Sequence, residues 1–386
     1  MLSAATAVQS RAALRLIVVG RGSVEVFFFA ALPLLYLALF VYVMAAGYHP
    51  FDFHTFWHSG RDVLHGRSPY SASLPAVAHK ETFRPFVYPA PAAIAMVPFS
   101  LLPYAVADVL WFVLGFAAIV GALSLLGVRD WRCYGALLAW PAVWSSLVNG
   151  AISALLVLGC AALWRYRDRA YVAGTIVAVL VVFKLYLWPL GVWLLVTRRW
   201  RASVTSVAVA GVLTIAGWAA IGFAGLRSYP HVLGLLTELV GPNSYSPYAL
   251  FRGLGASPSV SQLLMLASGG VVLVVAADRA RRPNGERTGF VLAIAASLAL
   301  TPIVWPHYLA LAAVAVALAW PNLGPAWILP MGLWFVLPAW SNGNPLVIAG
   351  ALFAFAGIFA WSAYRIGRGR PAPARAAPSI LRFAVK

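Results

Sequence analysis

Residues 24–46 of this chain read VEVFFFAALPLLYLALFVYVMAA, and the polar stretch GYHPFDFHTFWH follows them directly at 47–58. A helix needs roughly 20 apolar residues to cross a hydrocarbon core of about 30 Å. The apolar core of a cleaved signal peptide is shorter, about 7–15 residues. The first stretch therefore predicts a membrane-spanning helix, and the second predicts where the chain leaves the bilayer.

The remaining chain is equally apolar. Of its 386 residues 62% are hydrophobic and only 10% are charged, and the mean hydropathy is +0.85. These values lie outside the range of soluble domains. We expect an all-α polytopic membrane protein with about 12 transmembrane helices, within a range of 10–13. The apolar stretches are 24–46, 104–126, 133–148, 151–164, 170–183, 186–197, 202–222, 260–277, 289–303, 308–320, 326–339 and 345–364.

Several of these stretches are too short to cross an unperturbed bilayer alone, so we expect them to be helices of a packed bundle, tilted or beside an aqueous cavity. Segment 89–103 (PAPAAIAMVPFSLLP) contains four prolines, which favours a re-entrant or interfacial element over a span. The predicted organisation is a basic N-terminus at 1–23, one transmembrane domain at 24–364 and a disordered basic tail at 365–386. Within the domain, 47–103 is the first outer segment and 223–258 the second.

Positive charge sets the predicted orientation. Most of the 28 Lys and Arg residues cluster in segments that this scheme places on one face, and such clusters favour the cytoplasm. Both termini are then cytoplasmic. The formal net charge of +18 is a topology signal, and no nucleic-acid partner is needed to explain it. The clusters are Arg11, Arg15 and Arg21; Arg129 and Arg132; Arg165, Arg167 and Arg169; Arg198, Arg199 and Arg201; Arg279, Arg281, Arg282 and Arg287; and the tail from Arg365 to Lys386.

Candidate polar chemistry gathers on the other face. All seven histidines map to outer segments or outer span ends, together with Asp52, Asp62, Glu81 and Glu238. Apolar residues from 51 to 64 recur at near-helical spacing, which predicts an amphipathic interfacial helix. Asp52 would lie in its first turn, where the helix dipole favours an ionised carboxylate. The alternative is that Asp52 only caps the helix, while Asp62 is solvated or paired with an arginine.

Metal binding is a second possibility for this helix. His54 and His58 are spaced i, i+4 and could bind a metal with Asp52 or Asp62, although no glutamate lies between them as in HExxH. The simpler interpretation is a pair of interfacial histidines. The two cysteines, Cys133 and Cys160, lie in predicted spans and indicate packing rather than a disulfide or zinc site.

Short motifs at the predicted outer span ends resemble one family. They are DFHTFW at 52–57, LHGRSPY at 64–70, YPAP at 88–91, VNG at 148–150, FKLY at 183–186 with RRWR at 198–201, and LTPIVWPHY at 300–308. In this order they resemble glycosyltransferase family 87, of the GT-C superfamily of membrane enzymes that use polyprenyl-phosphate sugars. The resemblance extends over residues 24 to 320.

The resemblance implies a role for individual residues. It implies that Asp52 is the general base and that Lys184, His307, Tyr308 and Arg67 face the donor phosphate. Contacts with the sugar or the acceptor would come from His54, His58, Tyr88, Asn149 and Asn243. The family often has Gly-Gln where this chain has Gly150-Ala151, and Glu-Asn-Gln-Ser at 241–244, where this chain reads GPNS. These departures leave the acceptor contacts open.

The chemistry that the resemblance implies makes few demands on the protein. A lipid phosphate leaves as a stable anion, so one carboxylate to take the acceptor proton and donors for the phosphate oxygens suffice. We expect an inverting, metal-independent hexosyltransferase without a cofactor, with its site on the outer face of a bacterial plasma membrane. The donor would carry mannose, or alternatively arabinofuranose, and the acceptor would be a glycolipid or glycan. The chain has no D-x-D, G-x-x-x-x-G-K or G-x-G-x-x-G motif for nucleotide chemistry.

Other interpretations remain open at this point. Lys184 could extend to the interface to solvate its ammonium, and His307 could simply pack. Arg84, Arg227 and Arg252 are more typical of solvated loop residues than of phosphate ligands. A secondary transporter, or a carrier of lipid-linked sugars, would share the topology. It would be expected to have inverted repeats and polar groups near the bilayer midplane.

Overall fold

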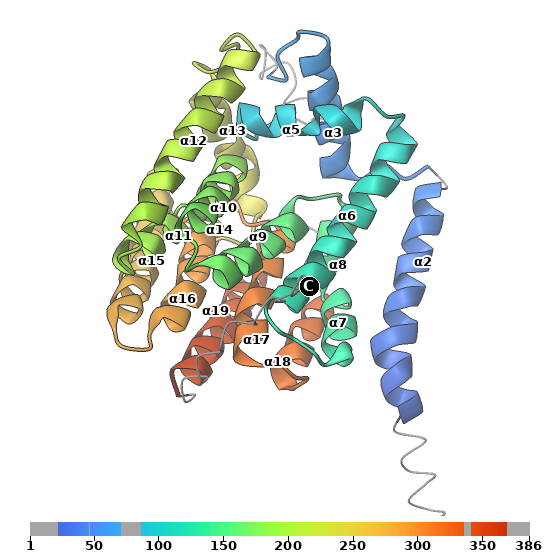
Figure 1. The fold of residues 1–386 in the computed structure, drawn as a ribbon, viewed down its shortest axis with the longest axis vertical. Helices are drawn as coiled ribbons and strands as arrows, with labels where there is room; N and C mark the ends of the chain where they lie inside the picture. The colour runs from blue at the N-terminus through green and yellow to red at the C-terminus, as the bar shows by residue number, and fades with distance from the viewer. Residues whose placement is uncertain (1–21, 46, 71–85, 336–340, 369–386) are drawn as a thin grey trace, which may run out of the picture.

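The computed structural model describes residues 22–45, 47–70, 86–335 and 341–368, and within these ranges the chain is helical without strands (Figure 1). The predicted N-terminal segment lies almost entirely outside the described residues, as do His79, Lys80, Glu81 and Arg84. The predicted tail is described only at its start, where helix α19 continues to Arg368.

The helices follow the apolar pattern closely. The first half of the chain forms a π-helical turn at Phe27–Ala31, α2 Leu32–Ala45, α3 Phe51–Leu64, α5 Ala90–Ser100, α6 Tyr104–Leu125, α7 Trp131–Leu138, α8 Pro141–Val148, α9 Ser153–Tyr166, α10 Ala170–Phe183, a 3-10 turn at Leu185–Leu187 and α11 Pro189–Val196. The second half forms α12 Trp200–Ala220, α13 Tyr229–Val240, a 3-10 turn at Gly241–Asn243, α14 Pro247–Gly253, α15 Pro258–Arg281, α16 Glu286–Ala299, a 3-10 helix at Pro306–Leu311, α17 Ala312–Ala319, α18 Pro325–Ile328, a 3-10 helix at Leu329–Phe335 and α19 Pro345–Arg368.

Five of these helices are long and apolar enough to cross a membrane by themselves. They are Gly22–Met44, Tyr104–Leu125, Trp200–Ala220, Pro258–Arg281 and Pro345–Arg368. A sixth span results if α8 and α9, bent by 119° at their junction, are counted as one. The polytopic helical class is therefore confirmed, whereas a total of about 12 spans stays a prediction that depends on the shorter helices.

The predicted single span at 133–148 is wrong, because the chain forms two helices there. Pro141 begins α8, and a proline cannot continue the preceding helix since it lacks an N–H and its ring clashes with the previous turn. The chain turns again between α8 and α9, at Asn149–Ile152. Hydropathy alone did not reveal these breaks, because all three helices are apolar.

Small residues hold the centre of the bundle together. In α17 every residue from Ala312 to Leu318 is buried. A Cβ atom added to Gly174 of α10 would lie 2.5 Å from the carbonyl oxygen of Ala202 in α12. Helices in lipid associate by close packing rather than by expelling water, and small residues allow that approach.

The amphipathic helix predicted at 51–64 is confirmed as α3. It packs against α5, and Figure 1 shows the two at one end of the bundle, with α5 lying across the direction of α12. Ser100 of α5 donates a hydrogen bond to the carbonyl oxygen of Trp57 at 2.7 Å. With 11 residues, α5 is about 16 Å long and too short to cross a bilayer alone.

Candidate active site

Asp52 lies in the first turn of α3 but does not cap the helix. The N-cap residue is Pro50, and no side chain accepts a capping hydrogen bond. The backbone N–H groups of Asp52 and Phe53 instead donate to the carbonyl oxygen of Asn149, at 2.9 and 3.3 Å. Since the first-turn donors already have a partner, the carboxylate of Asp52 is left free for another role.

The turn between α8 and α9 is shaped to receive α3. Gly150 has a φ of +62°, and a Cβ atom there would lie 2.5 Å from the Cβ of Phe53. Trp111 stacks on the Phe53 ring with centroids 5.6 Å apart, and its indole N–H donates to the carbonyl oxygen of Gly150 at 2.8 Å. Glycine thus meets two needs at once, a left-handed backbone and close contact with α3.

Four more predicted site residues converge on Asp52. The Nε2 atom of His307 lies 3.7 Å from Oδ2 of Asp52, slightly beyond hydrogen-bond distance. Lys184 donates from Nζ to the hydroxyl of Tyr308 at 2.6 Å. The same Nζ lies 4.0 Å from the ring centroid of Tyr88, a cation–π distance. We refer to Asp52, Tyr88, Lys184, His307 and Tyr308 as the Asp52 cluster.

The polar side chains of the Asp52 cluster lie at breaks between helices. Lys184 follows α10 directly, with an extended backbone before the next 3-10 turn. His307 and Tyr308 begin the 3-10 helix that starts at Pro306. Because side chains at helix ends are not enclosed by neighbouring turns of their own helix, polar groups from distant segments can meet there. Lys184, His307 and Tyr308 are all buried, which is costly for polar groups that lack partners.

Tyr88 is positioned through the backbone around it. The hydroxyl of Tyr70 donates to the carbonyl oxygen of Tyr88 at 2.7 Å, and the hydroxyl of Tyr229 donates to that of Val87 at 3.0 Å. Tyr70 in turn stacks on Trp218 of α12 with centroids 5.0 Å apart. The segment after α3, the segment before α5 and α13 are therefore joined beside the cluster.

The carboxylate of Asp52 is electrostatically unusual. Its Oδ2 is buried and accepts no hydrogen bond from any residue that the structure describes. Burial raises the pKa of Asp52 from its ordinary value of 3.8 to about 6, while the positive charge of Lys184 acts to lower it. A carboxylate in this state is still mostly ionised at neutral pH and is a stronger base than a solvated one.

Not every predicted residue joins the cluster. Arg67 was expected at the donor phosphate, but its guanidinium pairs with Asp62 at 2.9 Å and is 64% exposed. It follows the C-terminal end of α3, whereas Asp52 lies at the N-terminal end, about 20 Å away along a helix of 14 residues. The predicted pairing of Asp62 with an arginine is confirmed.

The expected acceptor contacts are divided between several places. The rings of His54 and His58 lie 4.3 Å apart, with Tyr104 5.9 Å from His54. The side-chain amide of Asn149 donates to the carbonyl oxygen of Ser145 at 2.8 Å, so this residue serves the cluster through its backbone. Asn243 accepts from Ser341 through its carbonyl oxygen at 3.2 Å. In the described part of the chain no group of three or more His, Cys, Asp or Glu side chains could hold a metal ion.

Sequence reasoning missed Tyr186 as a site residue. Its ring stacks on Tyr308 with centroids 5.0 Å apart, and its buried hydroxyl has no hydrogen-bond partner among the described residues. A partnerless buried hydroxyl next to Lys184 and Tyr308 is available to an oxygen-rich ligand. Its position two residues after Lys184, in the same FKLY motif, was the available signal.

Comparisons with known proteins match the chain to one family. The family model for glycosyltransferase family 87 matches residues 86–306, more than half of the chain. The chain belongs to glycosyltransferase family 87. The matched region contains Tyr88, Lys184 and Tyr186, begins after Asp52 and ends one residue before His307.

One curated relative gives more detail. It is the polyprenol-phosphate-mannose-dependent alpha-(1-2)-phosphatidylinositol pentamannoside mannosyltransferase of Mycobacterium tuberculosis (strain CDC 1551 / Oshkosh), which is 29% identical to this chain over 271 residues. The match covers 65% of the family 87 chain and 58% of the relative's length. No solved structure matches.

Proposed function

We propose that this family 87 protein transfers mannose from a polyprenyl-phosphate donor to a hydroxyl of a phosphatidylinositol-based glycolipid, with Asp52 as the general base. The observation that carries the proposal is the convergence of Asp52, whose buried Oδ2 accepts no hydrogen bond from the described residues, with the cationic and hydroxyl donors Lys184 and Tyr308. The name of the curated relative supports mannose and this class of acceptor.

The bonding changes follow from the chemistry of the groups. Asp52 takes the proton of the acceptor hydroxyl as its oxygen attacks the anomeric carbon. The bond between that carbon and the phosphate oxygen breaks, and polyprenyl phosphate leaves with the electron pair. A single displacement of this kind inverts the configuration at the anomeric carbon.

Lys184 and Tyr308 are suited to the leaving phosphate. An ammonium and a hydroxyl 2.6 Å apart offer several donors to its oxygens, and charge-assisted hydrogen bonds are the stronger ones. His307 and Tyr186 add one further donor each at the same place. In this scheme the protein needs no metal, because the stabilising charge comes from Lys184.

We assign the reaction to the outer face of the membrane. The basic segments around α10, α12 and α15 lie at the ends of these helices that are remote from α3, and such segments favour the cytoplasm. A polyprenyl-linked donor suits this side because it requires no nucleotide sugar there.

The test uses purified protein, a panel of polyprenyl-phosphate sugars that includes mannose and arabinofuranose, and mannosylated phosphatidylinositol as the acceptor. We expect a product one hexose larger from the mannose donor alone, formed without added divalent cations and in the presence of EDTA. A carrier of lipid-linked sugars would release or move the donor without forming a new glycosidic bond. Absence of any glycosylated product with every donor, from protein that binds the donor, would refute the proposal.

A further inference from the structure

A basic pocket lies at the end of the bundle opposite the Asp52 cluster. Its volume is about 1160 Å³, and the loops α9–α10, α11–α12 and α15–α16 line it. Asp168 precedes α10 and Lys184 follows it, so that the helix separates the two sites by about 20 Å. Its arginines are Arg167, Arg198, Arg199, Arg201, Arg281 and Arg282, and we call it the arginine pocket.

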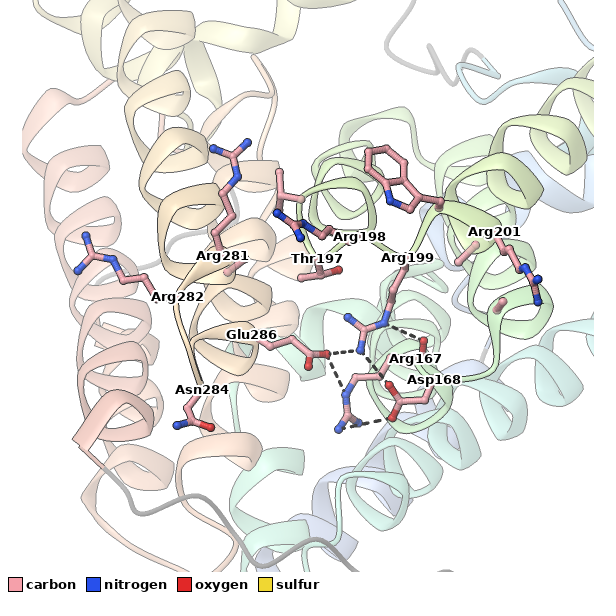
Figure 2. A pocket seen from close by; sticks show the side chains of 15 residues that line it. Arg167, Asp168, Thr197, Arg198, Arg199, Arg201, Arg281, Arg282, Asn284 and Glu286 are labelled. Atoms are coloured by element: carbon pink, nitrogen blue, oxygen red, sulfur yellow. Dashed lines mark hydrogen bonds and ion pairs between the residues drawn. The ribbon is translucent and has the colours of Figure 1, made fainter.

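The acids in the arginine pocket neutralise only part of this charge. Its lining has two carboxylates, and Glu286 pairs with both Arg167 at 3.0 Å and Arg199 at 2.8 Å. Asp168 also pairs with Arg199, at 2.9 Å, as Figure 2 shows. Six arginines and two acids leave a formal charge of +4 on the lining.

Three of the arginines have no carboxylate of their own. Arg198, Arg201 and Arg281 make no ion pair with any residue that the structure describes, while Arg282 pairs with Asp278 at 2.7 Å. Among the residues that the structure describes, the two acids of the lining are already paired with Arg167 and Arg199, and Asp278 is paired with Arg282. The described part of the chain therefore supplies no acid for the other three arginines, and an anion from outside the chain would supply the counter-charge.

The backbone at Arg198 is a second, independent observation on this pocket. Arg198 ends α11 in the left-handed region, with a φ of +58°, where glycine is favoured. The N–H of Arg198 donates to Leu195 and that of Arg199 to Leu194, both at 3.0 Å, the hydrogen bonds of a glycine-type helix end. A side chain kept at such a position despite its conformational cost indicates a use for that side chain.

We propose that the arginine pocket binds the phosphate headgroup of an anionic phospholipid from the cytoplasmic leaflet. Guanidinium groups match phosphate oxygens in pairs, and basic pockets between membrane helices on this side suit anionic headgroups. The sides of α12 and α15 that lead away from the pocket are open to acyl chains, with Val204 69% and Val274 70% exposed. Trp200, 60% exposed at the edge of the pocket, has the amphipathic ring that membrane interfaces favour.

The test measures lipid binding to the full-length protein in detergent, without any transfer reaction, so its result is independent of the proposed function. Phosphatidylglycerol and phosphatidylcholine with the same acyl chains are titrated while thermal unfolding is followed, and inorganic phosphate is titrated in a third arm. We expect phosphatidylglycerol to raise the melting temperature at lower concentration than phosphatidylcholine, with inorganic phosphate much weaker than either.

Two substitutions and a matched control locate the site. Arg198→Gly removes a charge where glycine is conformationally favoured, and Arg281→Gln removes a second. Each should weaken phosphatidylglycerol binding about fivefold, and the double variant about 25-fold. The control is Asn284→Gly, which changes an uncharged lining residue that also has a left-handed backbone, with a φ of +61°. It should bind phosphatidylglycerol like the unmodified protein.

Three results would overturn the proposal. The first is equal binding of the two lipids. The second is binding of inorganic phosphate as tight as that of phosphatidylglycerol, which would make free phosphate the ligand. The third is unchanged phosphatidylglycerol binding in the double arginine variant.

Discussion

Asp52 and Asp130 lie at the starts of two helices, yet their carboxylates are in opposite situations. Asp130 caps α7 and accepts hydrogen bonds from the backbone N–H groups of Arg132 at 3.1 Å and Leu323 at 3.0 Å. It also pairs with the Arg132 guanidinium at 2.9 Å, and hydrogen bonding from that side chain lowers the pKa of Asp130 to about 2. At the start of α3 the carbonyl oxygen of Asn149, and not a capping side chain, accepts the hydrogen bonds of the first backbone N–H groups. Burial raises the pKa of Asp52.

The difference shows what separates a structural carboxylate from a reactive one in this molecule. Asp130 has all its hydrogen-bond capacity used within the protein, and protonating it would cost free energy. Asp52 has an oxygen that accepts nothing from the described residues, so a substrate proton is a partner it lacks. The same residue type near the start of a helix is thus in two different situations: Asp130 is the N-cap of α7, whereas Asp52 is the second residue of α3, where the carbonyl oxygen of Asn149 satisfies the helix end.

The largest expected effect is that of Asp52→Asn. The amide keeps the shape of the side chain but is not a base, so transfer should fall by a factor of about 10² to 10⁴ while donor binding is retained. The measurement is the rate of mannosyl transfer together with donor affinity. If the variant transferred mannose at the unmodified rate, Asp52 would have no part in the mechanism. Asp52 and Asp130 would then not differ in reactivity.

The second-largest effect is expected from removing the charge of Lys184. Lys184→Gln loses a charged donor to the leaving phosphate, and hydrogen bonds to charged groups contribute about 1.5–3 kcal/mol, so kcat/KM should fall roughly 10- to 150-fold. Tyr308→Phe is the matched control at the other end of the 2.6 Å hydrogen bond, because it removes a neutral donor and should cost less. Unchanged donor affinity in Lys184→Gln would mean that the lysine is structural.

The pH dependence of kcat/KM tests the raised pKa directly. A base works in its ionised form, so kcat/KM should fall about tenfold per pH unit below about pH 6. In Lys184→Gln this limb should move to higher pH, since the ammonium acts to lower the pKa. A limb near pH 4 in the unmodified protein would place Asp52 in solvent rather than in a buried site.

The smallest effect on catalysis is expected for Asp130→Ala. Loss of a helix cap costs about 1–2 kcal/mol of stability, so the melting temperature should fall while kcat/KM at permissive temperature stays unchanged. The pKa of Asp130 is lowered in the folded state, so its contribution is present above the ordinary value of 3.8 and lost as the pH falls towards about 2. Loss of transfer without loss of stability would show that the two ends of the bundle are coupled.

Sequence patterns predicted much of the architecture and the core of the candidate site. The helix at 51–64 followed from the spacing of its apolar residues, and the gathering of Lys184, His307 and Tyr308 near Asp52 was implied by the family resemblance together with their places at predicted outer span ends. Both features depend on local pattern and helix length, which a sequence carries directly.

Other features depend on pairing between distant groups, which the pattern does not carry. The sequence did not show which anion Arg67 binds, and in the fold it pairs with Asp62. The side chain of Asn149 was expected to contact the sugar or the acceptor, whereas its backbone carbonyl oxygen is the part that contacts α3. The division of 133–148 into two helices was not predicted, because the residues at the break are as apolar as those of a continuous span.

The order of the cluster along the chain has a consequence for biosynthesis. Asp52 is made some 250 residues before Tyr308, an interval on the order of 10 to 50 s at ordinary rates of translation. Lys184 is made about halfway through that interval, whereas Tyr308 is absent until its end. Under the proposed function, incomplete chains lack the full set of groups for transfer until the last third of the polypeptide has entered the membrane.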